Sequence, residues 1–574
     1  MININGIAGS PGYGQGTAAV NRQTAPIPDK QSITDPAAEE QRFRNAQNDC
    51  ESNMRALMET SAEISEDASE ILSAYIEILR DESFFKKALK RVEQELTNIE
   101  YLIYDECQTV MKKFAAFDDP LLKERAVDIE NVCNQLIRSL LGIQQDFVLE
   151  TNTQDIVVVA EDLTPTETVK MDKSKLRGFV TEKGGPTSHT VILAKALGIP
   201  AIVGVAGALD SVSDGDTLLL DAFTGTVTVN PDADKIKSFN AVSDTYKLKQ
   251  EQYTKGAALP AETPDGHKVD VNVNSGDADS IASLNWENCD GIGLLRTEFL
   301  YMDHSDYPDE ETQYAVYSAL AANGGGKEVI IRTLDIGGDK QIAYMDLPKE
   351  ENPFLGYRAI RICLDRKAVF HTQLRAILRA SAHGNVKIMF PMIVSLEELR
   401  EAKLCVEEAK QSLRSGNVPF NENIPVGIMI ETPAAVLVSD CLAKESDFFS
   451  IGSNDLIQYM TATDRMNERV QHLYDSCNPA ILRAINLVAK NAQAASIPWG
   501  ICGEVASEDR LIPLWASLGV SELSVAPSMV GRVKFLVRRS DRTKLLPEMG
   551  RVLDMCEIDR IKQALDAALT RLDL

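Results

Sequence analysis

The spacing of apolar residues changes along the chain and divides it into regions. Residues 1–22 alternate apolar with small residues, which is typical of a strand and a loop, and residues 23–36 have the Pro, Gln, Thr and Asp content of a linker. From about residue 36 to residue 143, apolar positions recur every three or four residues, the period of an amphipathic helix. One stripe consists of Leu122, Ala126, Ile129, Cys133, Leu136 and Leu140, and a second of Leu96, Ile99, Ile103 and Val110. A small helical bundle follows, with breaks at Asp81 and at residues 117–120.

Short runs of β-branched residues replace the helical period after residue 150. The runs cover residues 155–161, 178–181, 201–204, 217–222 and 225–231. One helical stretch through Val191 and Leu197 interrupts them, and this mixture predicts an α/β domain. The helical bundle lies between the first strand and the other strands, so we interpret it as an insertion. Residues 232–258 are polar and Lys-rich and predict a helical connector.

A regular alternation of strand-like and helical stretches begins after residue 260. The strand-like runs are Val269–Asn274, Gly291–Leu295, Glu328–Thr333, Lys387–Pro391, Val426–Ile430, Phe448–Ile451, Trp499–Cys502 and Glu522–Ala526. Eight β/α repeats over roughly 300 residues have the size of a (β/α)₈ barrel. The predicted fold is therefore α/β and multidomain: an N-terminal α/β domain with an inserted helical bundle, and a C-terminal (β/α)₈ barrel.

Composition and charge narrow the classes of partner. The chain has 574 residues, 44% of them hydrophobic, and a formal net charge of −26, which disfavours nucleic acid or an anionic membrane surface as a partner. Ten cysteines without a CxxC pair indicate reduced thiols rather than a zinc ribbon. The N-terminus lacks the pattern of a signal peptide, and Pro200 interrupts the most apolar stretch, so we expect a cytoplasmic protein without membrane insertion.

Polar and charged residues gather at the ends of the predicted barrel strands. The active site of such a barrel lies where the strands end. The residues at or just after these ends are Arg296, Arg332, Glu431, Ser453, Asn454, Asp455, Cys502 and Glu504. Their convergence on one rim makes this rim the candidate site.

These residue types suit a substrate that carries phosphate and carboxylate groups. Arg296 and Arg332 offer planar forks for anions, and Arg465, after the sixth strand, adds a third cation. Glu431 and Asp455 are hard oxygen donors of the kind that Mg²⁺ prefers. Cys502 supplies a proton donor. Phosphoryl transfer requires this kind of positioning and charge neutralisation.

Each of these residues also has a purely structural interpretation. An arginine at a strand end commonly forms a salt bridge, and a cysteine that ends an apolar run commonly fills a core. Glu431 precedes Thr432-Pro433, where it could cap the next helix. Taken together on successive strand ends, the residues favour the functional interpretation.

A second candidate centre lies near residue 189. Gly184, Gly185 and Pro186 form a loop, and Thr187 or Ser188 would cap the following helix. His189 then falls in the first helical turn, where free N–H groups and the helix dipole favour a phosphoryl group. A surface histidine beside a helix cap remains the alternative on these residues alone.

Several long motifs resemble one family. They are Gly184-GPTSHT-Val191, Arg332-TLDIGGDK-Gln341, Glu351-NPFLGYRAIR-Ile362, Val426-GIMIETPAA-Val436, Phe449-SIGSNDLIQY-Met460 and Cys502-GE-Val505. The sequence closely resembles Enzyme I of the bacterial phosphoenolpyruvate:sugar phosphotransferase system, from the N-terminal strand to near residue 540. Ser453 stands where many members have Thr, which keeps the hydroxyl. Pro186 replaces an arginine of some members and fits a turn.

The resemblance implies a role for each matching residue. His189 is implied to be the phosphorylated nucleophile, Arg296, Arg332, Arg465 and Asn454 to bind substrate, Glu431 and Asp455 to bind Mg²⁺, and Cys502 to protonate the enolate. The helical insertion is implied to dock the carrier protein HPr, and the family works as a homodimer through the barrel. Phosphoenolpyruvate would bind on the barrel, and His189 would swing in to take the phosphoryl group and out to meet HPr.

The resemblance also implies a division into four parts. These are a phosphohistidine α/β domain of residues 1–22 and 146–231, a helical HPr-binding domain of residues 23–145, a helical linker of residues 232–260, and a phosphoenolpyruvate-binding barrel and dimerisation domain of residues 261–574. Part of the hinge is expected in the linker.

Other functions fit the sequence less well than that of an Enzyme I. Pyruvate phosphate dikinase and phosphoenolpyruvate synthase share the phosphohistidine domain and the barrel, but they need an ATP-binding domain of several hundred residues ahead of the histidine. The stretch before His189 is largely helical and has no nucleotide-loop signature. A catalytically silent phosphoenolpyruvate sensor has no support in the residues present. A nitrogen-regulatory Enzyme I usually carries an added N-terminal sensory domain, and this sequence begins at the first strand.

Overall fold

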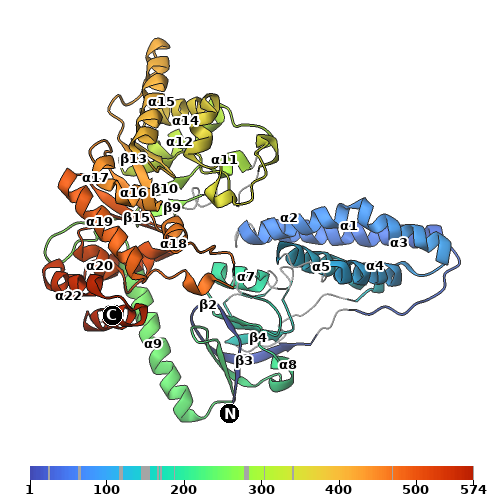
Figure 1. Cartoon of the computed structure of the whole chain (residues 1–574). Helices are drawn as coiled ribbons and strands as arrows, with labels where there is room; N and C mark the ends of the chain where they lie inside the picture. Colours follow the sequence, from blue (N-terminus) through green and yellow to red (C-terminus); the bar gives the residue numbers. More distant parts are fainter. Residues whose placement is uncertain are drawn as a thin grey trace. The chain divides into compact units, whose positions relative to one another are not determined.

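The chain forms two compact units, residues 1–247 and 248–574 (Figure 1). The computed structural model describes residues 1–22, 26–61, 66–114, 120–143, 155–163, 167, 171–172, 174–185, 188–276, 284–302, 304–338, 342–467 and 469–572. Within these ranges, no helix combines the length and the apolar character that crossing a membrane requires.

The first unit contains an eight-stranded sheet in the order β1-β8-β7-β3-β4-β5-β6-β2. Its strands are β1 (Ile2–Asn5), β2 (Ile7–Ser10), β3 (Tyr13–Asn21), β4 (Ile156–Ala160), β5 (Leu176–Thr181), β6 (Ala201–Val203), β7 (Thr217–Asp221) and β8 (Thr226–Val229). The first 22 residues form three strands rather than the predicted strand and loop. Only Gly6 separates β1 from β2, yet these strands lie at the two ends of the sheet order, so the sheet curls until its two edges approach each other at Gly6. A Cβ at Gly6 would lie 2.6 Å from the Val203 carbonyl oxygen.

Helices α7 (His189–Leu197) and α8 (Ala208–Ser211) cover this sheet. Ala194 of α7 packs with Phe179 and Val158 in one cluster, and Ala208 of α8 packs with Val157 in another. Successive residues of β4 therefore serve opposite faces, as the two-residue period of a strand requires. All five residues of β4 are buried, because both faces of the sheet carry a core.

Five helices follow β3 in the chain and form a bundle, drawn as long blue ribbons in Figure 1. They are α1 (Pro36–Ser61), α2 (Glu66–Arg80), α3 (Glu82–Glu95), α4 (Ile99–Phe114) and α5 (Pro120–Leu141). Their core includes Phe43, Tyr75, Phe85 and Leu102, and the predicted stripe on α5 reaches it through Cys133 and Leu136. The break at Asp81 lies between α2 and α3 as predicted, whereas residues 117–119 lie outside the described residues.

The predicted stripe that begins at Leu96 is wrong at its first position. Leu96 lies between α3 and α4 with φ at 48°, a left-handed conformation that ends a helix. Hydrogen bonds to the preceding linker hold this break, because the Ile33 N–H donates to the Leu96 carbonyl and the Asn98 N–H to the Gln31 carbonyl. Contacts distant in sequence thus override the local helical period.

Helix α9 (Ala233–Gly256) follows β8, and the boundary between the two units falls within it, after Lys247. Its two ends pack in different units. Tyr246 packs edge-to-face against Tyr13 at a centroid distance of 5.7 Å, and Tyr253 packs in the same way against Phe535 at 4.9 Å. The predicted helical connector is therefore one continuous helix whose ends belong to separate cores.

The second unit is a closed barrel of eight parallel strands. The strands are β9 (Asp270–Ser275), β10 (Gly291–Arg296), β11 (Glu328–Arg332), β12 (Asn385–Phe390), β13 (Val426–Ile430), β14 (Phe449–Gly452), β15 (Trp499–Cys502) and β16 (Glu522–Val525). All eight coincide with the predicted runs to within two residues at each end. The predicted barrel is confirmed.

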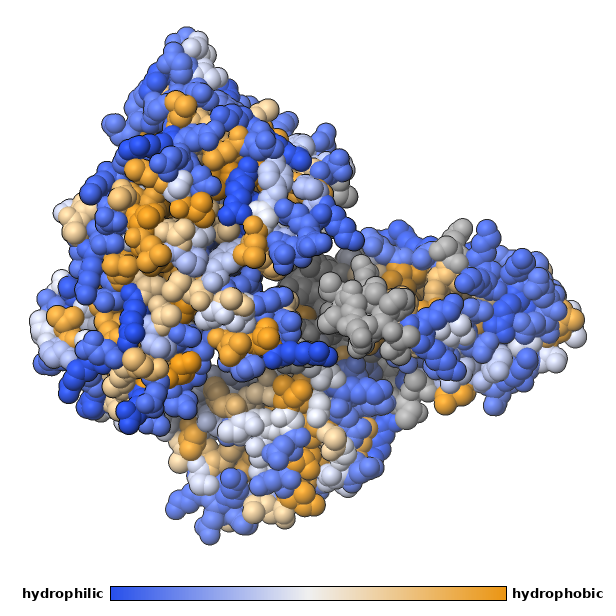
Figure 2. Space-filling model, in the orientation of Figure 1, coloured by the Kyte–Doolittle hydropathy of each residue, from blue (hydrophilic) through white to orange (hydrophobic). Residues whose placement is uncertain are grey.

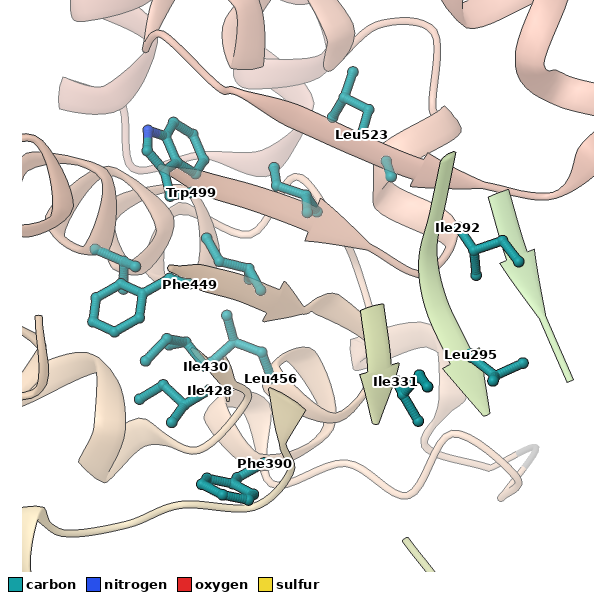
Figure 3. Close-up of a cluster of buried hydrophobic side chains, with 14 of the residues drawn as sticks. Ile292, Leu295, Ile331, Phe390, Ile428, Ile430, Phe449, Leu456, Trp499 and Leu523 are labelled. Carbon is teal, nitrogen blue, oxygen red and sulfur yellow. The ribbon is translucent and has the colours of Figure 1, made fainter. Parts of the chain in front are cut away.

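Helices surround the barrel. They are α11 (Phe299–Met302), α12 (Glu310–Asn323), α13 (Ile360–Asp365), α14 (Lys367–Ala380), α15 (Leu396–Ser415), α16 (Pro433–Leu437), α17 (Ser439–Leu442), α18 (Ser453–Thr461), α19 (Pro479–Ala495), α20 (Ile512–Ser517), α21 (Val530–Val537), α22 (Arg542–Asp554) and α23 (Ile558–Arg571). Leu295, Ile331 and Phe449 belong to the core between strands and helices (Figure 3), whereas Leu294 and Ile330 belong to a smaller cluster with Cys502. This alternation gives each strand an inner and an outer face.

Candidate active site

A cavity of about 620 Å³ opens where the barrel strands end. Its lining includes all the barrel residues that the sequence analysis proposed as site residues: Arg296, Arg332, Glu431, Asn454, Asp455, Arg465 and Cys502. Six of these residues come from the ends of β10, β11, β13 and β15 or from the start of α18, which follows β14, and Arg465 comes from the loop after α18. The structure therefore brings them together, while the role of each remains a prediction.

A buried network of arginines and carboxylates forms one wall of the cavity. Arg332 Nη2 donates to Glu298 Oε1 at 2.7 Å, and Arg332 Nη1 lies 2.9 Å from Asp335 Oδ2. The other oxygen of Asp335 accepts from Arg358 Nη2 at 2.9 Å, and Asp455 lies 3.5 Å from the same nitrogen. Burial lowers the pKa of Arg332, but the Glu298 and Asp335 carboxylates outweigh burial and raise it above its ordinary value. Arg332 is therefore held charged and oriented toward the cavity.

Three members of this network were missed as site residues from sequence: Glu298, Asp335 and Arg358. Asp335 and Arg358 lie within motifs that carried the family resemblance, but they fall in loops rather than at predicted strand ends. The feature that could have identified these two residues from the sequence is their charge within otherwise apolar stretches. Ala359, directly after Arg358, has φ at 55° and donates its N–H to the Ile336 carbonyl at 2.9 Å. This unusual backbone fixes where Arg358 leaves the chain.

Glu431 lies at the floor of the cavity and is 1% exposed. Its Oε1 accepts from the Met392 N–H at 2.6 Å. Burial, together with the negative charges of Asp455 and Asp335, raises the pKa of the Glu431 carboxyl to about 8. A carboxyl in this state gains most from a nearby cation.

The charges of the site fit a divalent cation. The negative charge of Asp455 raises the pKa of the Glu431 carboxyl, so a divalent cation bound to both groups would relieve this repulsion. Among the described residues, no three His, Cys, Asp or Glu side chains are grouped as a complete metal site. An ion on Glu431 and Asp455 would therefore complete its shell with substrate oxygens or water, as Mg²⁺ does.

Cys502 ends β15 inside the barrel and is 2% exposed. Its Sγ donates to the Ile451 carbonyl at 3.4 Å. Burial raises the pKa of this thiol to about 11, so it carries its proton at neutral pH. None of the ten cysteines is in a disulfide in this structure, and eight of them are buried.

Asn454 occupies the first turn of α18 and joins two loops. Its Oδ1 accepts from the Glu504 N–H at 3.2 Å, and its carbonyl accepts from the Tyr474 hydroxyl at 3.2 Å. Gly503, directly before Glu504, has φ at 91°, and a Cβ on this residue would lie 2.5 Å from Ser453 Oγ. Only glycine fits this close approach.

The second candidate centre is at the start of α7 in the first unit. The helix begins at His189, with Ser188 in an extended conformation as its N-cap residue. The Ser188 hydroxyl makes no capping hydrogen bond within the described residues, and Thr187 and Pro186 lie outside them. Gly198 ends the helix with φ at 66°. The predicted helix start is confirmed at the backbone.

Comparisons with known proteins first define a class. Family models described as PEP-utilising enzyme match the chain in three parts: the N-terminal model over residues 5–125, the mobile-domain model over residues 152–225, and the PEP-binding-domain model over residues 250–542. The cavity thus lies in the part that matches a PEP-binding domain, and His189 in the part that matches a mobile domain. PEP is phosphoenolpyruvate.

Similar full-length proteins define the family within that class. Phosphoenolpyruvate-protein phosphotransferase of Haemophilus influenzae is 40% identical over 540 residues, 93% of each chain, and that of Priestia megaterium is 36% identical over 559 residues, 97% of each. This chain belongs to the phosphoenolpyruvate-protein phosphotransferase family. A solved structure described as the NMR solution structure of Enzyme I aligns at a TM-score of 0.36 with 29% identity, covering 42% of this chain and 99% of the other.

Proposed function

We propose that this protein transfers the phosphoryl group of phosphoenolpyruvate to its own His189 and then to the histidine of HPr, with release of pyruvate. This is the first step of sugar uptake by the phosphotransferase system. The observation that carries the proposal is the cavity, which collects every sequence-proposed barrel residue in a chain that aligns over almost its whole length with phosphoenolpyruvate-protein phosphotransferases.

Cations and an amide bind the substrate in this proposal. Arg296, Arg332 and Arg465 neutralise its phosphate and carboxylate, and Asn454 orients it. Arg358 joins them, because its guanidinium lies in the same wall and shares Asp335 with Arg332. The carboxylates of Glu298 and Asp335 fix Arg332 and Arg358 before substrate arrives, so that these two arginines need little reorganisation on binding.

Cys502 completes the chemistry of the leaving group. Attack of the neutral imidazole of His189 on phosphorus breaks the bond between phosphorus and the enol oxygen and leaves the enolate of pyruvate. The Cys502 thiol, protonated because burial raises its pKa to about 11, then gives its proton to the methylene carbon. Proton return from solvent restores the thiol.

Glu431 and Asp455 are the residues that would hold Mg²⁺. The raised pKa of Glu431, to which the negative charge of Asp455 contributes, supports this assignment. When bound, the ion would offset the negative charge of the substrate phosphate.

The proposal also assigns partners and a role to each part of the chain. His189 and the cavity belong to different compact units, which supports a mobile α/β domain of residues 1–22 and 146–231. The helical domain of residues 23–145 would dock HPr, the linker of residues 232–260 would contain part of the hinge, and the barrel of residues 261–574 would dimerise. We place the protein in the cytoplasm.

An apolar patch on the barrel supports the homodimer. Leu404 of α15, Leu437 and Val438 at the end of α16, and Leu487 of α19 are all exposed, Leu437 by 73%. Figure 2 shows apolar surface over the region that Figure 1 labels α16 and α17. Apolar side chains gathered on one face of a folded domain commonly mark a protein interface.

The test uses ³²P-labelled phosphoenolpyruvate with Mg²⁺. Wild type should become labelled and pass the label to HPr, and His189→Ala should take no label. His371→Ala, a change on the outer helix α14, serves as the control and should behave as wild type. Label retained on His189→Ala would move the nucleophile elsewhere. Labelling by ATP instead of phosphoenolpyruvate would favour a dikinase or synthase.

A further inference from the structure

The last helix of the chain, α23, packs on the barrel beyond the range matched by the PEP-binding family model. Ile561, Leu565 and Ala568 form its buried face. The preceding helix α22 is anchored by Arg483 of α19, whose Nε donates to the Leu553 carbonyl at 3.0 Å. Because this buried face is fixed on the barrel, the polar side chains of α23 are held beside particular neighbours.

One of these residues, Lys562, reaches a loop that borders the cavity. Its Nζ donates to Asp475 Oδ2 at 2.6 Å, and Asp475 Oδ1 accepts from the Cys477 N–H at 2.8 Å. Asp475 directly follows Tyr474, which lines the cavity and donates its hydroxyl to the Asn454 carbonyl. Burial raises the pKa of Tyr474 to about 12, although the neighbouring Arg465 opposes the rise, so the hydroxyl remains a donor.

A second connection runs through the loop after β15. Arg510 Nε lies 3.5 Å from Asp566 of α23 and 3.4 Å from Glu508. Glu508 Oε2 also accepts from the Ser476 hydroxyl at 2.5 Å, which ties this loop to the one that carries Tyr474. The same loop carries Glu504, whose N–H binds Asn454 Oδ1. Both loops that contact Asn454 are therefore held together and held to α23.

We propose that α23 is a brace for the substrate site, in which Lys562 and Asp475 act as positioning residues. They fix Tyr474, and through it Asn454 and Arg465, in the geometry that binds phosphoenolpyruvate. The pair is partly shielded, with side chains 36% and 17% exposed, so its attraction exceeds that of a fully solvated pair. Preordering the wall reduces the ordering that the substrate must otherwise impose. This inference rests on the proposed function of the cavity.

The first test is steady-state kinetics of pyruvate release with HPr as acceptor. Lys562→Met keeps the alkyl chain and removes the charge, and Asp475→Asn removes the partner charge. Each should raise the KM for phosphoenolpyruvate about fivefold with a smaller change in kcat, as expected when a network contact is lost. Lys562→Arg should restore most of the affinity. The matched control is Arg560→Gln, because Arg560 lies on the same helix and its ion pair with Glu557 is exposed.

The second test separates positioning from general stability. In the double variant Lys562→Met/Asp475→Asn, the KM should equal that of either single variant, since both remove one interaction. The Tm of each variant should lie no more than about 2–4 °C below that of Arg560→Gln, so that every variant is folded at the assay temperature and the KM reports on the site. Single variants with the KM of the control, or effects on KM that multiply in the double variant, would overturn the brace. Absence of pyruvate release by wild type would instead overturn the proposed function.

Discussion

The thiol of Cys502 shows how surroundings determine the chemistry of a residue. It faces the barrel interior beside Leu294 and Met429, and burial raises its pKa to about 11. In Cys502→Ala we expect the KM for phosphoenolpyruvate to stay within about threefold of wild type, while kcat for pyruvate release falls by roughly 10²–10⁴ through loss of the general acid. Cys441→Ala, at an exposed cysteine, should change neither parameter. Unchanged kcat in Cys502→Ala would assign the proton to another donor.

Glu522 predicts how stability depends on pH. It begins β16, and its Oε1 is buried without a partner among the described residues. Burial and the neighbouring Glu328 carboxylate raise its pKa to about 8, although Asn272 and Lys387 oppose the shift. A raised pKa means that the folded state holds the proton more tightly than the unfolded chain. The proton on Glu522 therefore contributes its full stabilisation of the folded state below the unfolded pKa of about 4.3. This stabilisation declines as the pH rises above that value and is lost above about pH 8.

Replacing this carboxyl by an amide should remove that dependence. Between pH 6 and pH 9 we expect wild type to lose on the order of 1–3 kcal/mol more stability than Glu522→Gln. Urea unfolding followed by tryptophan fluorescence measures the stability of the second compact unit, which contains Glu522, because all three tryptophans lie between residues 286 and 515. Glu557→Gln, at an exposed glutamate, is the control. Parallel pH profiles for wild type and Glu522→Gln would contradict the assignment.

At the scale of elements, the junction between β1 and β2 depends on a close approach of two glycines, Gly6 and Gly225. Gly225 has φ at 70°, and a Cβ there would lie 2.3 Å from the Gly6 carbonyl oxygen. The Gly6 N–H donates to the Gly225 carbonyl at 2.9 Å, so neither strand end moves freely. The two ends of the sheet order thus meet where no side chain fits.

Gly225→Ala should therefore destabilise the first unit by about 2–4 kcal/mol, which combines left-handed backbone strain with a steric clash. Gly215→Ala provides the matched control, because Gly215 also has a positive φ, at 86°, but nothing lies within 4 Å of its would-be Cβ. It should lose only about 1 kcal/mol. Differential scanning calorimetry measures both variants, and equal losses would mean that the clash relaxes without cost.

At the scale of the whole molecule, the proposed Mg²⁺ site on Glu431 and Asp455 predicts that stability and phosphotransfer depend on Mg²⁺. A ligand that binds only the folded state stabilises it by about 2.7 kcal/mol at a hundredfold excess over its Kd. We expect Mg²⁺ to raise the Tm of the barrel unit in wild type and to have little effect in Glu431→Gln. Removal of Mg²⁺ with a chelator should abolish labelling of His189. A Tm that rises equally in both proteins would place the ion elsewhere.

The sequence by itself determined the order and type of most elements. Its apolar periods are local properties, so they predicted the eight barrel strands, the helical insertion and the helix that starts at His189. It also identified several of the barrel residues that line the cavity, such as Arg332 and Glu431, because strand ends in a parallel barrel meet on one rim. Roles for these residues came from resemblance and remain to be tested.

Only the tertiary structure decided which distant groups share a charge or a hydrogen bond. Leu96 leaves its predicted helix because the linker at Gln31 and Ile33 binds the chain there. Glu298, Asp335 and Arg358 belong to the site because three separate loops converge behind Arg332. Lys562 reaches Asp475 across 87 residues of sequence. Periodicity records which face of an element is buried, but it does not record which charge lies opposite, since that depends on how the elements pack.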